Sequence, residues 1–263
     1  MKQAALVTGA SSGIGADIAR ELAGRGMAVI LVARRAERLE ALATELSALG
    51  VPALALSCDL ADRQQLDALM DRATAWLQQQ SLALTVLINN AGTGVWDWFE
   101  NQSAATSQRD IDLNITALTT LCHAFVPLAR EHGQPSHILN IASLAALLPT
   151  PRFAVYSATK AYVQRFSEIL GYELRDSHIR VTCSCPGGVL TEFMEHAGQQ
   201  LKGDTGIMAS ADVARLSVAA MFAGDTLYVP GALNKASALV RFLPRSLKLR
   251  LVEKSMLVTV QDK

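Results

Sequence analysis

The sequence lacks an excess of charge of either sign. Its 263 residues hold 24 Lys and Arg against 24 Asp and Glu, so the formal net charge is zero. Proteins that bind nucleic acids usually carry a basic patch or stripe, because contacts to phosphates dominate their affinity. We therefore expect no nucleic acid among the partners of this chain.

Long apolar runs are also missing. No stretch of about 18 apolar residues runs without a charge, as a transmembrane helix would require. The first residues, Met1-Lys2-Gln3, pass directly into a short apolar run without the long core and cleavage site of a signal peptide. The sequence therefore predicts neither a transmembrane helix nor a secretory signal.

Cysteine and histidine are few and poorly spaced for bridges or metals. The four cysteines form no C-x-x-C pair, and Cys183 and Cys185 would share one face of a strand, which disfavours a disulfide. None of the five histidines has the spacing of a metal-ligand motif. We expect free thiols, a reducing cytoplasmic location and no metal site.

What the sequence does contain is a regular alternation of short apolar runs and longer amphipathic stretches. Such alternation predicts an α/β fold, a doubly wound, mostly parallel seven-stranded sheet with helices on both faces. No linker or repeat interrupts it, so residues 1–263 are expected to form a single domain. The expected strands are Ala4–Thr8, Ala28–Ala33, Ala53–Ser57, Thr85–Asn89, His137–Ile141, Val181–Ser184 and Thr226–Val229, and the main expected helices are Ile14–Gly24, Ala36–Leu49, Arg63–Gln79, Ser107–Glu131 and Ser157–Asp176.

The turn after the first expected strand is rich in small residues. It reads Thr8-Gly9-Ala10-Ser11-Ser12-Gly13-Ile14-Gly15 and opens directly into a helix. Small residues let a backbone turn tightly and approach a pyrophosphate, and the helix N-terminus offers free N–H groups to the anion. The context predicts a dinucleotide site at this turn, with an ordinary Gly/Ser-rich turn as the alternative.

Two arginines follow the second expected strand. Sites that prefer NAD usually place a carboxylate here for the ribose 2′-hydroxyl, whereas this chain has Ala33 followed by Arg34 and Arg35. Guanidinium groups suit bidentate contact with a 2′-phosphate, which favours NADP(H) over NAD(H). The alternative is that both arginines merely solvate the start of a helix.

The next two strands also end in polar or small residues. Asp59, in the run Cys58-Asp59-Leu60, could accept a hydrogen bond from an adenine amino group, while Asp62 is better placed to cap the following helix. The run Asn89-Asn90-Ala91-Gly92 ends the fourth strand, and its small and amide residues fit close approach to a ribose.

A chemical constellation follows the fifth strand. Ser143 stands at its end, and Tyr156 and Lys160 come soon after at a spacing of four, which places them on one helix face. A phenol has an ordinary pKa near 10, and a nearby ammonium favours the phenolate and should bring that pKa toward the working range. Tyr156 could then exchange a proton with a substrate oxygen held by Ser143. Asn114 could support a water chain to Lys160.

With these residues together, the chain resembles the short-chain dehydrogenases/reductases, in their single-domain branch. The resemblance covers about residues 4 to 192. It implies a Rossmann-type fold and a catalytic set of Ser143, Tyr156 and Lys160, with Asn114 as the fourth member. It also implies that Arg34 binds the 2′-phosphate. The cofactor-binding residues expected in all are Gly9, Ser11, Ser12, Gly13, Ile14, Gly15, Arg34, Arg35, Asp59, Leu60, Asn90, Ala91, Gly92, Tyr156, Lys160, Pro186, Gly187, Val189 and Thr191.

The segments expected to wall the substrate pocket are mostly apolar or aromatic. They are Thr93–Phe99, Leu144–Phe153 and Val189–Gly206, and Trp96 and Phe193 are the expected contacts beside Ser143 and Tyr156. We predict an uncharged, hydrophobic carbonyl or alcohol substrate, with Arg152 the nearest cation. Residues 187–212 and 231–263 are expected to form lid segments.

The C-terminal segment Leu233 to Met256 combines apolar residues with lysines and arginines. It fits a lid with a solvated basic face better than a helix that touches a membrane, although a basic amphipathic pattern is compatible with both. Family resemblance further implies a homodimer or homotetramer built from the stretches Ser107–Glu131 and Ser157–Asp176.

The sequence thus predicts an NADP(H)-dependent oxidoreductase that moves a hydride between the nicotinamide and a carbonyl or alcohol. A cofactor-binding regulator with little turnover stays open as an alternative, because function depends on sites rather than folds. A related isomerase or lyase is a third possibility, but such relatives often carry longer substrate domains.

Overall fold

One parallel sheet forms the centre of the molecule. The computed structural model describes residues 2–199 and 206–259, and side chains through residue 255. Seven strands lie in the order β3-β2-β1-β4-β5-β6-β9, with every neighbouring pair parallel, which confirms the predicted fold class. The strands are β1 (Lys2–Thr8), β2 (Ala28–Ala33), β3 (Ala53–Ser57), β4 (Leu82–Asn89), β5 (Ser136–Ile141), β6 (Ile179–Ser184) and β9 (Leu227–Tyr228).

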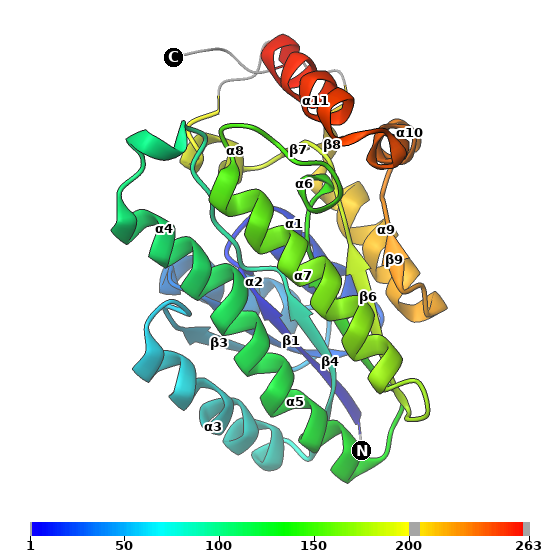
Figure 1. Cartoon of the computed structure of the whole chain (residues 1–263). Helices are drawn as coiled ribbons and strands as arrows, with labels where there is room; N and C mark the ends of the chain where they lie inside the picture. The colour runs from blue at the N-terminus through cyan, green and yellow to red at the C-terminus, as the bar shows by residue number, and fades with distance from the viewer. Residues whose placement is uncertain (1, 200–205, 260–263) are drawn as a thin grey trace.

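Helices cover both faces of this sheet (Figure 1). One face packs against α1 (Gly13–Gly24), α2 (Ala36–Ser47) and α9 (Ser210–Ala223). The other face packs against α3 (Arg63–Gln79), α5 (Leu118–His132) and α7 (Ala154–Glu173). β1, β2 and β4 are buried almost throughout because both of their faces are covered, so they read as continuous apolar runs.

Shorter elements complete the fold. They are the 3-10 helices η1 (Phe99–Asn101) and η3 (Leu239–Phe242), the π-helical segment η2 (Asp112–Ala117), the helices α4 (Ala104–Ile111), α6 (Leu144–Leu147), α8 (Glu192–His196), α10 (Ala232–Ala238) and α11 (Arg245–Thr259), and the two-stranded sheet of β7 (Val189–Leu190) and β8 (Met208–Ala209). In Figure 1, β7, β8, α8, α10 and α11 all lie above the carboxyl ends of the main strands.

Helix boundaries follow local chemistry. The carboxylate of Asp62 caps α3 by accepting from the backbone N–H groups of Gln64 and Gln65, as the sequence predicted. α5 ends at Gly133, whose positive φ of 67° suits a left-handed C-cap. The expected helix Ser157–Asp176 instead starts at Ala154, which moves Tyr156 into its first turn.

The continuous helical stretch Ala104–His132, which comprises α4, η2 and α5, is long and apolar enough to cross a membrane by length and composition alone. Its inner residues Leu121, Phe125 and Ala129 are nevertheless buried against the sheet. A core helix of a globular domain has the same properties, so this match is weak evidence for a membrane span.

The four cysteines are buried free thiols: Cys58, Cys122, Cys183 and Cys185. The sulfur atoms of Cys183 and Cys185 lie 3.9 Å apart on one face of the β6 end, too far for a disulfide bond. Among the residues that the structure describes, no group of three His, Cys, Asp or Glu side chains could hold a metal ion.

Candidate active site at the carboxyl edge of the sheet

A buried polar chain fixes the ends of β4 and β5 beneath the site. The amide of Asn89 donates to the side-chain oxygen of Asn140 at 2.8 Å, and Asn140 donates to the Ser167 hydroxyl at 2.8 Å. Ser167 in turn donates to the carbonyl oxygen of Val163, one turn earlier in α7. These bonds join two strands to the helix that carries Tyr156 and Lys160, so the site stands on a rigid base.

Ser143, Tyr156 and Lys160 come together as the sequence predicted. Ser143 caps α6 by accepting from the Ala145 N–H, and it forms a hydrogen bond with the Tyr156 hydroxyl. The Lys160 ammonium lies 5.8 Å from the centre of the Tyr156 ring and donates to the carbonyl oxygen of Ile141 at 2.9 Å. A phenol, a hydroxyl and an ammonium thus share one buried corner at the ends of β5 and α7.

The electrostatics of this corner differ from the expectation. Burial raises the pKa of Tyr156 to about 12, although the hydrogen bond from Ser143 works against the rise. Burial also lowers the pKa of Lys160 from 10.5 to about 8, with the nearby Cys183 and Cys185 opposing the change. Desolvation disfavours the charged form of each group, so at neutral pH the phenol is protonated. In this arrangement Tyr156 holds a proton that it can give to a substrate oxygen.

Asn114 lies next to Lys160 inside the π-helical segment η2. Its amide oxygen accepts from the Thr93 N–H at 3.0 Å, and its nitrogen donates to the Thr93 carbonyl and to the Thr159 hydroxyl. A Cβ added at Gly92 would lie 3.0 Å from the Lys160 Nζ and 3.2 Å from the Asn114 Oδ1. Gly92 therefore keeps open the space between the two side chains. π-helical turns are frequent at functional sites, where they re-aim one side chain.

An aromatic cluster surrounds Tyr156. Its ring centre lies 4.8 Å from that of Phe153 and 5.3 Å from that of Phe193, and Trp96 packs edge-on against Phe153 at 5.1 Å. The backbone N–H of Trp96 donates to the Ala197 carbonyl oxygen at 2.8 Å, which joins this loop to the end of α8. The predicted substrate residues Trp96 and Phe193 therefore flank Tyr156, and Phe153 is a further wall that the predicted set of contacts did not single out.

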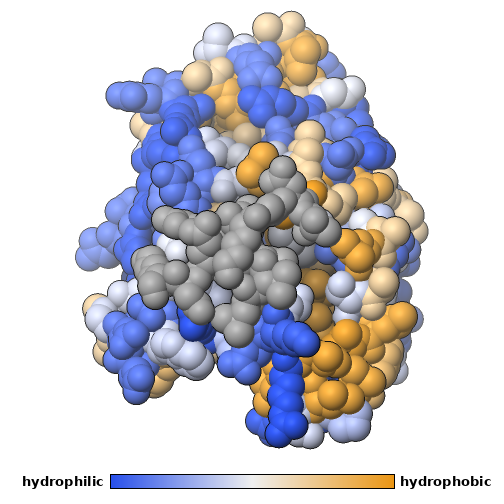
Figure 2. Space-filling view, turned by 90° about the horizontal axis from the view of Figure 1, so that it is seen from above, coloured by the Kyte–Doolittle hydropathy of each residue, from blue (hydrophilic) through white to orange (hydrophobic). Residues whose placement is uncertain are grey.

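The surface above the carboxyl edge is uneven in character. Seen from the top of Figure 1, hydrophobic residues gather on the side of α9 and α10, while hydrophilic residues dominate the opposite side (Figure 2). Leu233, Leu239 and Phe242 are exposed apolar side chains of α10 and η3. The predicted lid residues 200–205 lie outside the described part of the chain.

The turn between β1 and α1 has the form of an anion cradle. Gly13 adopts φ +54°, and a Cβ there would lie 2.8 Å from the Cγ2 of Thr191, so only glycine fits comfortably. Ser12 precedes α1 without capping it through its side chain, and the first turn of α1 contains no acidic residue. The N–H groups of this turn are thus left for an anion. The residues present fit the pyrophosphate of a dinucleotide.

Most other predicted cofactor residues line the same edge. The amide of Asn90 donates to the Thr8 carbonyl at 3.0 Å, which fixes the start of the cradle. Gly187 packs so closely against Asn234 of α10 that a Cβ would overlap its amide. The remaining positions are held by backbone contacts or core packing: Gly9 and Gly15 lie against Asn90, Leu60 and Ala91 pack in or against one half of the apolar core, Ile14 packs against the other half, the Pro186 carbonyl accepts from the Leu144 N–H, and Val189 of β7 pairs with Met208 of β8.

The adenosine end of the cradle is rich in charge. Arg34 is exposed just after β2. Burial acts to raise the pKa of Asp59, but the 2.7 Å ion pair with Arg109, the hydrogen bond from the Ala61 N–H and, last, the charge of Arg34 outweigh it, so that pKa lies below its usual value. The Asp59 carboxylate, which was expected to accept a hydrogen bond from an adenine amino group, therefore already accepts one from Arg109.

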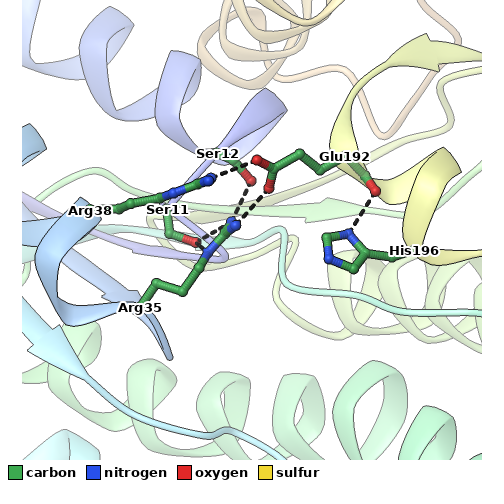
Figure 3. Close-up of polar contacts among 6 residues, drawn as sticks. All are labelled: Ser11, Ser12, Arg35, Arg38, Glu192 and His196. Carbon is green, nitrogen blue, oxygen red and sulfur yellow. Dashed lines mark hydrogen bonds and ion pairs between the residues drawn. The ribbon is translucent and has the colours of Figure 1, made fainter.

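Arg35 forms a separate cluster that sequence reasoning missed. Its guanidinium donates to the hydroxyls of Ser11 and Ser12 and to the Glu192 carboxylate of α8 (Figure 3). Arg38 of α2 binds the other oxygen of Glu192 at 2.6 Å. No local pattern could have revealed Glu192, since 157 positions separate it from Arg35.

Comparisons with known proteins agree with this architecture. Residues 3–202 match the family model described as short chain dehydrogenase. The chain belongs to the short-chain dehydrogenase family. It is therefore an oxidoreductase of that family, for which a nicotinamide cofactor is the general rule, and the resemblance stated from the sequence is confirmed.

Among individual relatives, a sulfoacetaldehyde reductase of Chromohalobacter salexigens is 36% identical over 211 residues, which cover 78% of this chain and 80% of that protein. A short-chain dehydrogenase from Sphingobium yanoikuyae, solved in complex with NADPH, is 33% identical with a TM-score of 0.79, covering 94% of this chain and 98% of that one. A Burkholderia phymatum family member solved with NAD has a TM-score of 0.84 at 24% identity, covering 94% and 95% of the two chains, and supports the fold alone.

Proposed function

We propose that this chain is an NADP(H)-dependent reductase of uncharged, hydrophobic carbonyl compounds, acting in the reverse direction on the corresponding alcohols. The observation that carries the proposal is the buried Tyr156 hydroxyl, hydrogen-bonded to Ser143 and enclosed by Phe153 and Phe193. A buried acid beside an apolar wall suits a neutral carbonyl oxygen that gains negative charge as it is reduced.

The residues have separate roles in this reaction. The cofactor, when bound, supplies the hydride. Ser143 orients the substrate oxygen by hydrogen bonding, and Tyr156 gives that oxygen its proton. Lys160 lies close enough to favour the phenolate that remains, and its depressed pKa lets it exchange protons near neutral pH. Asn114, which Gly92 leaves open toward Lys160, is proposed to hold the water that re-supplies the proton.

The cofactor would follow the turn between β1 and α1. Its pyrophosphate would lie over Ser11, Ser12 and Gly13, and the nicotinamide ribose would reach Lys160 and Tyr156. Pro186 and Thr191 would hold the carboxamide. We assign the 2′-phosphate to Arg34, with Arg35 beside it, because no carboxylate follows β2 at Ala33. The NADPH complex of the Sphingobium yanoikuyae relative supports this choice.

The catalytic assignment is tested by replacing Tyr156 with phenylalanine. Because general acid catalysis contributes about 100- to 10,000-fold, kcat for reduction should fall by that factor. Binding of NADPH, measured by calorimetry, should persist. Tyr162→Phe, which changes an exposed tyrosine of the same helix, serves as the control. If wild type oxidises no NADPH with any carbonyl of a broad panel, the cofactor-binding regulator becomes the better description.

The cofactor choice is tested separately by kinetics with NADPH and NADH. Arg34→Ala should raise the KM for NADPH several-fold and leave that for NADH nearly unchanged, since only NADPH carries the 2′-phosphate. Arg63→Ala, on the exposed face of α3, is a matched loss of one arginine elsewhere. A wild-type enzyme that prefers NADH would overturn the assignment of Arg34.

A sulfonated aldehyde is the second candidate substrate, because one relative is named a sulfoacetaldehyde reductase. Arg152 stacks over Trp98 at 4.9 Å and Trp96 at 5.9 Å, and so brings a cation to the rim of the aromatic cluster. A panel with neutral aromatic ketones, aliphatic aldehydes and sulfoacetaldehyde separates the two. Exclusive turnover of the sulfonate, lost in Arg152→Gln, would replace the hydrophobic substrate by the charged one.

A further inference from the structure

The cluster of Arg35, Arg38 and Glu192 lies where the proposed cofactor would place its extra phosphate. The Glu192 carboxylate accepts from Arg35 at 2.7 Å through one oxygen and from Arg38 at 2.6 Å through the other. It also forms a hydrogen bond with the Ser12 hydroxyl. Figure 3 shows the contacts of Arg35 and Arg38 converging from three elements: the β1–α1 turn, the start of α2 and the start of α8.

The carboxylate in this cluster is permanently charged. Hydrogen bonds from Arg38, and then from Arg35, lower the pKa of Glu192 to about 2. It therefore remains an anion throughout the pH range of any ordinary assay. Two guanidinium groups facing one carboxylate leave a net positive charge at the cluster, and Arg34 adds another at the end of β2.

The same donors suit a phosphate. Arg35 already contacts both serines of the turn that follows β1, at 2.8 to 3.1 Å, so its guanidinium lies at the edge of the anion cradle. A phosphate monoester carries about −1.5 to −2 charges near neutral pH and accepts forked hydrogen bonds from arginine. The Glu192 carboxylate, a monoanion, accepts hydrogen bonds from the guanidinium groups that a phosphate monoester would bind.

We propose that Glu192 is a specificity-determining residue that competes with the 2′-phosphate of NADP(H) for Arg35 and Arg38. The proposal rests on the assignment of the cofactor site above. When the 2′-phosphate binds, it takes over guanidinium donors that Glu192 holds, and Arg38 becomes a further phosphate ligand. The exchange reduces the advantage of NADP(H) over NAD(H), because each new bond to phosphate is offset by one lost to Glu192.

The size of the effect follows from exposure. The side chains of Arg35, Arg38 and Glu192 are 39%, 50% and 34% exposed, so solvent weakens both ion pairs. A three- to tenfold change in affinity corresponds to about 0.7 to 1.4 kcal/mol, which lies in the range expected of exposed ion pairs. Removing the competing charge should therefore tighten binding of a 2′-phosphate by about three- to tenfold.

Calorimetry on the intact chain tests the proposal without turnover. Glu192→Gln should bind 2′,5′-ADP and NADPH about three- to tenfold more tightly than wild type, following the estimate for exposed pairs. Binding of 5′-AMP and NADH should change by less than about twofold, since neither has a 2′-phosphate. Glu195→Gln, which removes an exposed carboxylate from the same short helix, should leave all four affinities unchanged.

Other outcomes are informative. Equal weakening of 2′,5′-ADP and 5′-AMP in Glu192→Gln would mean that Glu192 only holds α8 in place, and would overturn the competition. Unchanged affinity for 2′,5′-ADP would show that the phosphate does not reach Arg35 and Arg38. If wild type binds 5′-AMP better than 2′,5′-ADP, the NADP(H) assignment fails. The ratio of the 2′,5′-ADP affinities of Glu192→Gln and wild type tests the competition separately from that wild-type preference.

Discussion

Replacing Lys160 by methionine should remove a pH-dependent part of the stability of the cofactor-free protein. Lys160 is 4% exposed as a residue, and its ammonium has one protein acceptor among the described residues, the Ile141 carbonyl oxygen. Burial depresses its pKa from 10.5 to about 8. Between these two values the unfolded chain binds more protons than the folded one, so this group makes stability rise with pH.

The magnitude follows from the shift. A displacement from 10.5 to about 8 corresponds to about 3 kcal/mol at about 1.4 kcal/mol per pKa unit. This stability is fully present above the unfolded pKa of 10.5 and is lost as the pH falls through the folded pKa of about 8. Wild type should therefore gain about 3 kcal/mol relative to Lys160→Met across that window.

Urea unfolding of both proteins at a series of pH values measures the difference directly. The raised pKa values of Cys58 and Cys122 make both proteins less stable at alkaline pH, and that contribution cancels in the comparison. Methionine keeps the length and apolar stem of lysine, so the site stays filled. A free-energy difference that stays constant from neutral pH to above 10.5 would show that burial does not depress the Lys160 pKa.

Three further predictions concern the surroundings of the site. A Cβ at Gly94 would lie 2.6 to 3.0 Å from atoms of Tyr156, so Gly94→Ala should displace the phenol and lower kcat by about 10- to 100-fold, whereas Gly24→Ala, with open space, should not. Asn140→Ala removes the partner from two buried hydrogen bonds and should lower the free energy of unfolding by about 2 to 3 kcal/mol in urea titrations. Burial raises the pKa of Asp110 from 3.8 to about 6, so its stabilising contribution is present below 3.8 and lost as the pH rises through 6. Asp110→Asn should therefore be about 2 to 3 kcal/mol more stable than wild type above pH 6, and equal stability there would contradict the raised pKa.

Much of the fold could be predicted because its signals are local. The central strands read as continuous apolar runs, and β2 and β3 have the bounds that the sequence predicted. The five-residue helix α8 and the two-residue strands β7 and β8 are too short for the sequence to show a helical or strand periodicity. The start of α7 was predicted three residues late because Phe153 caps it without the side-chain hydrogen bond that marks a helix start.

The site residues also differ in whether a local sequence signal could predict them. Tyr156 and Lys160 were predictable because the helical period alone places them on one face of a helix. Ser143 was predictable because it directly follows an apolar strand that precedes this helix in the chain. The protonation states were not predictable, since they depend on how deeply packing buries each group. The ion pair of Arg35 with Glu192 joins residues 157 positions apart, and only the folded chain brings them into contact.

The first two residues of α8 connect the two halves of the site. Glu192 binds the arginines at the adenosine end, while the next residue, Phe193, packs on Tyr156 at the catalytic end. Ala197, just after this helix, accepts a hydrogen bond from the Trp96 backbone and so ties α8 to the aromatic wall. Both ends of the site therefore depend on one five-residue helix, so a shift of its backbone at Glu192 would also move the Phe193 ring against Tyr156.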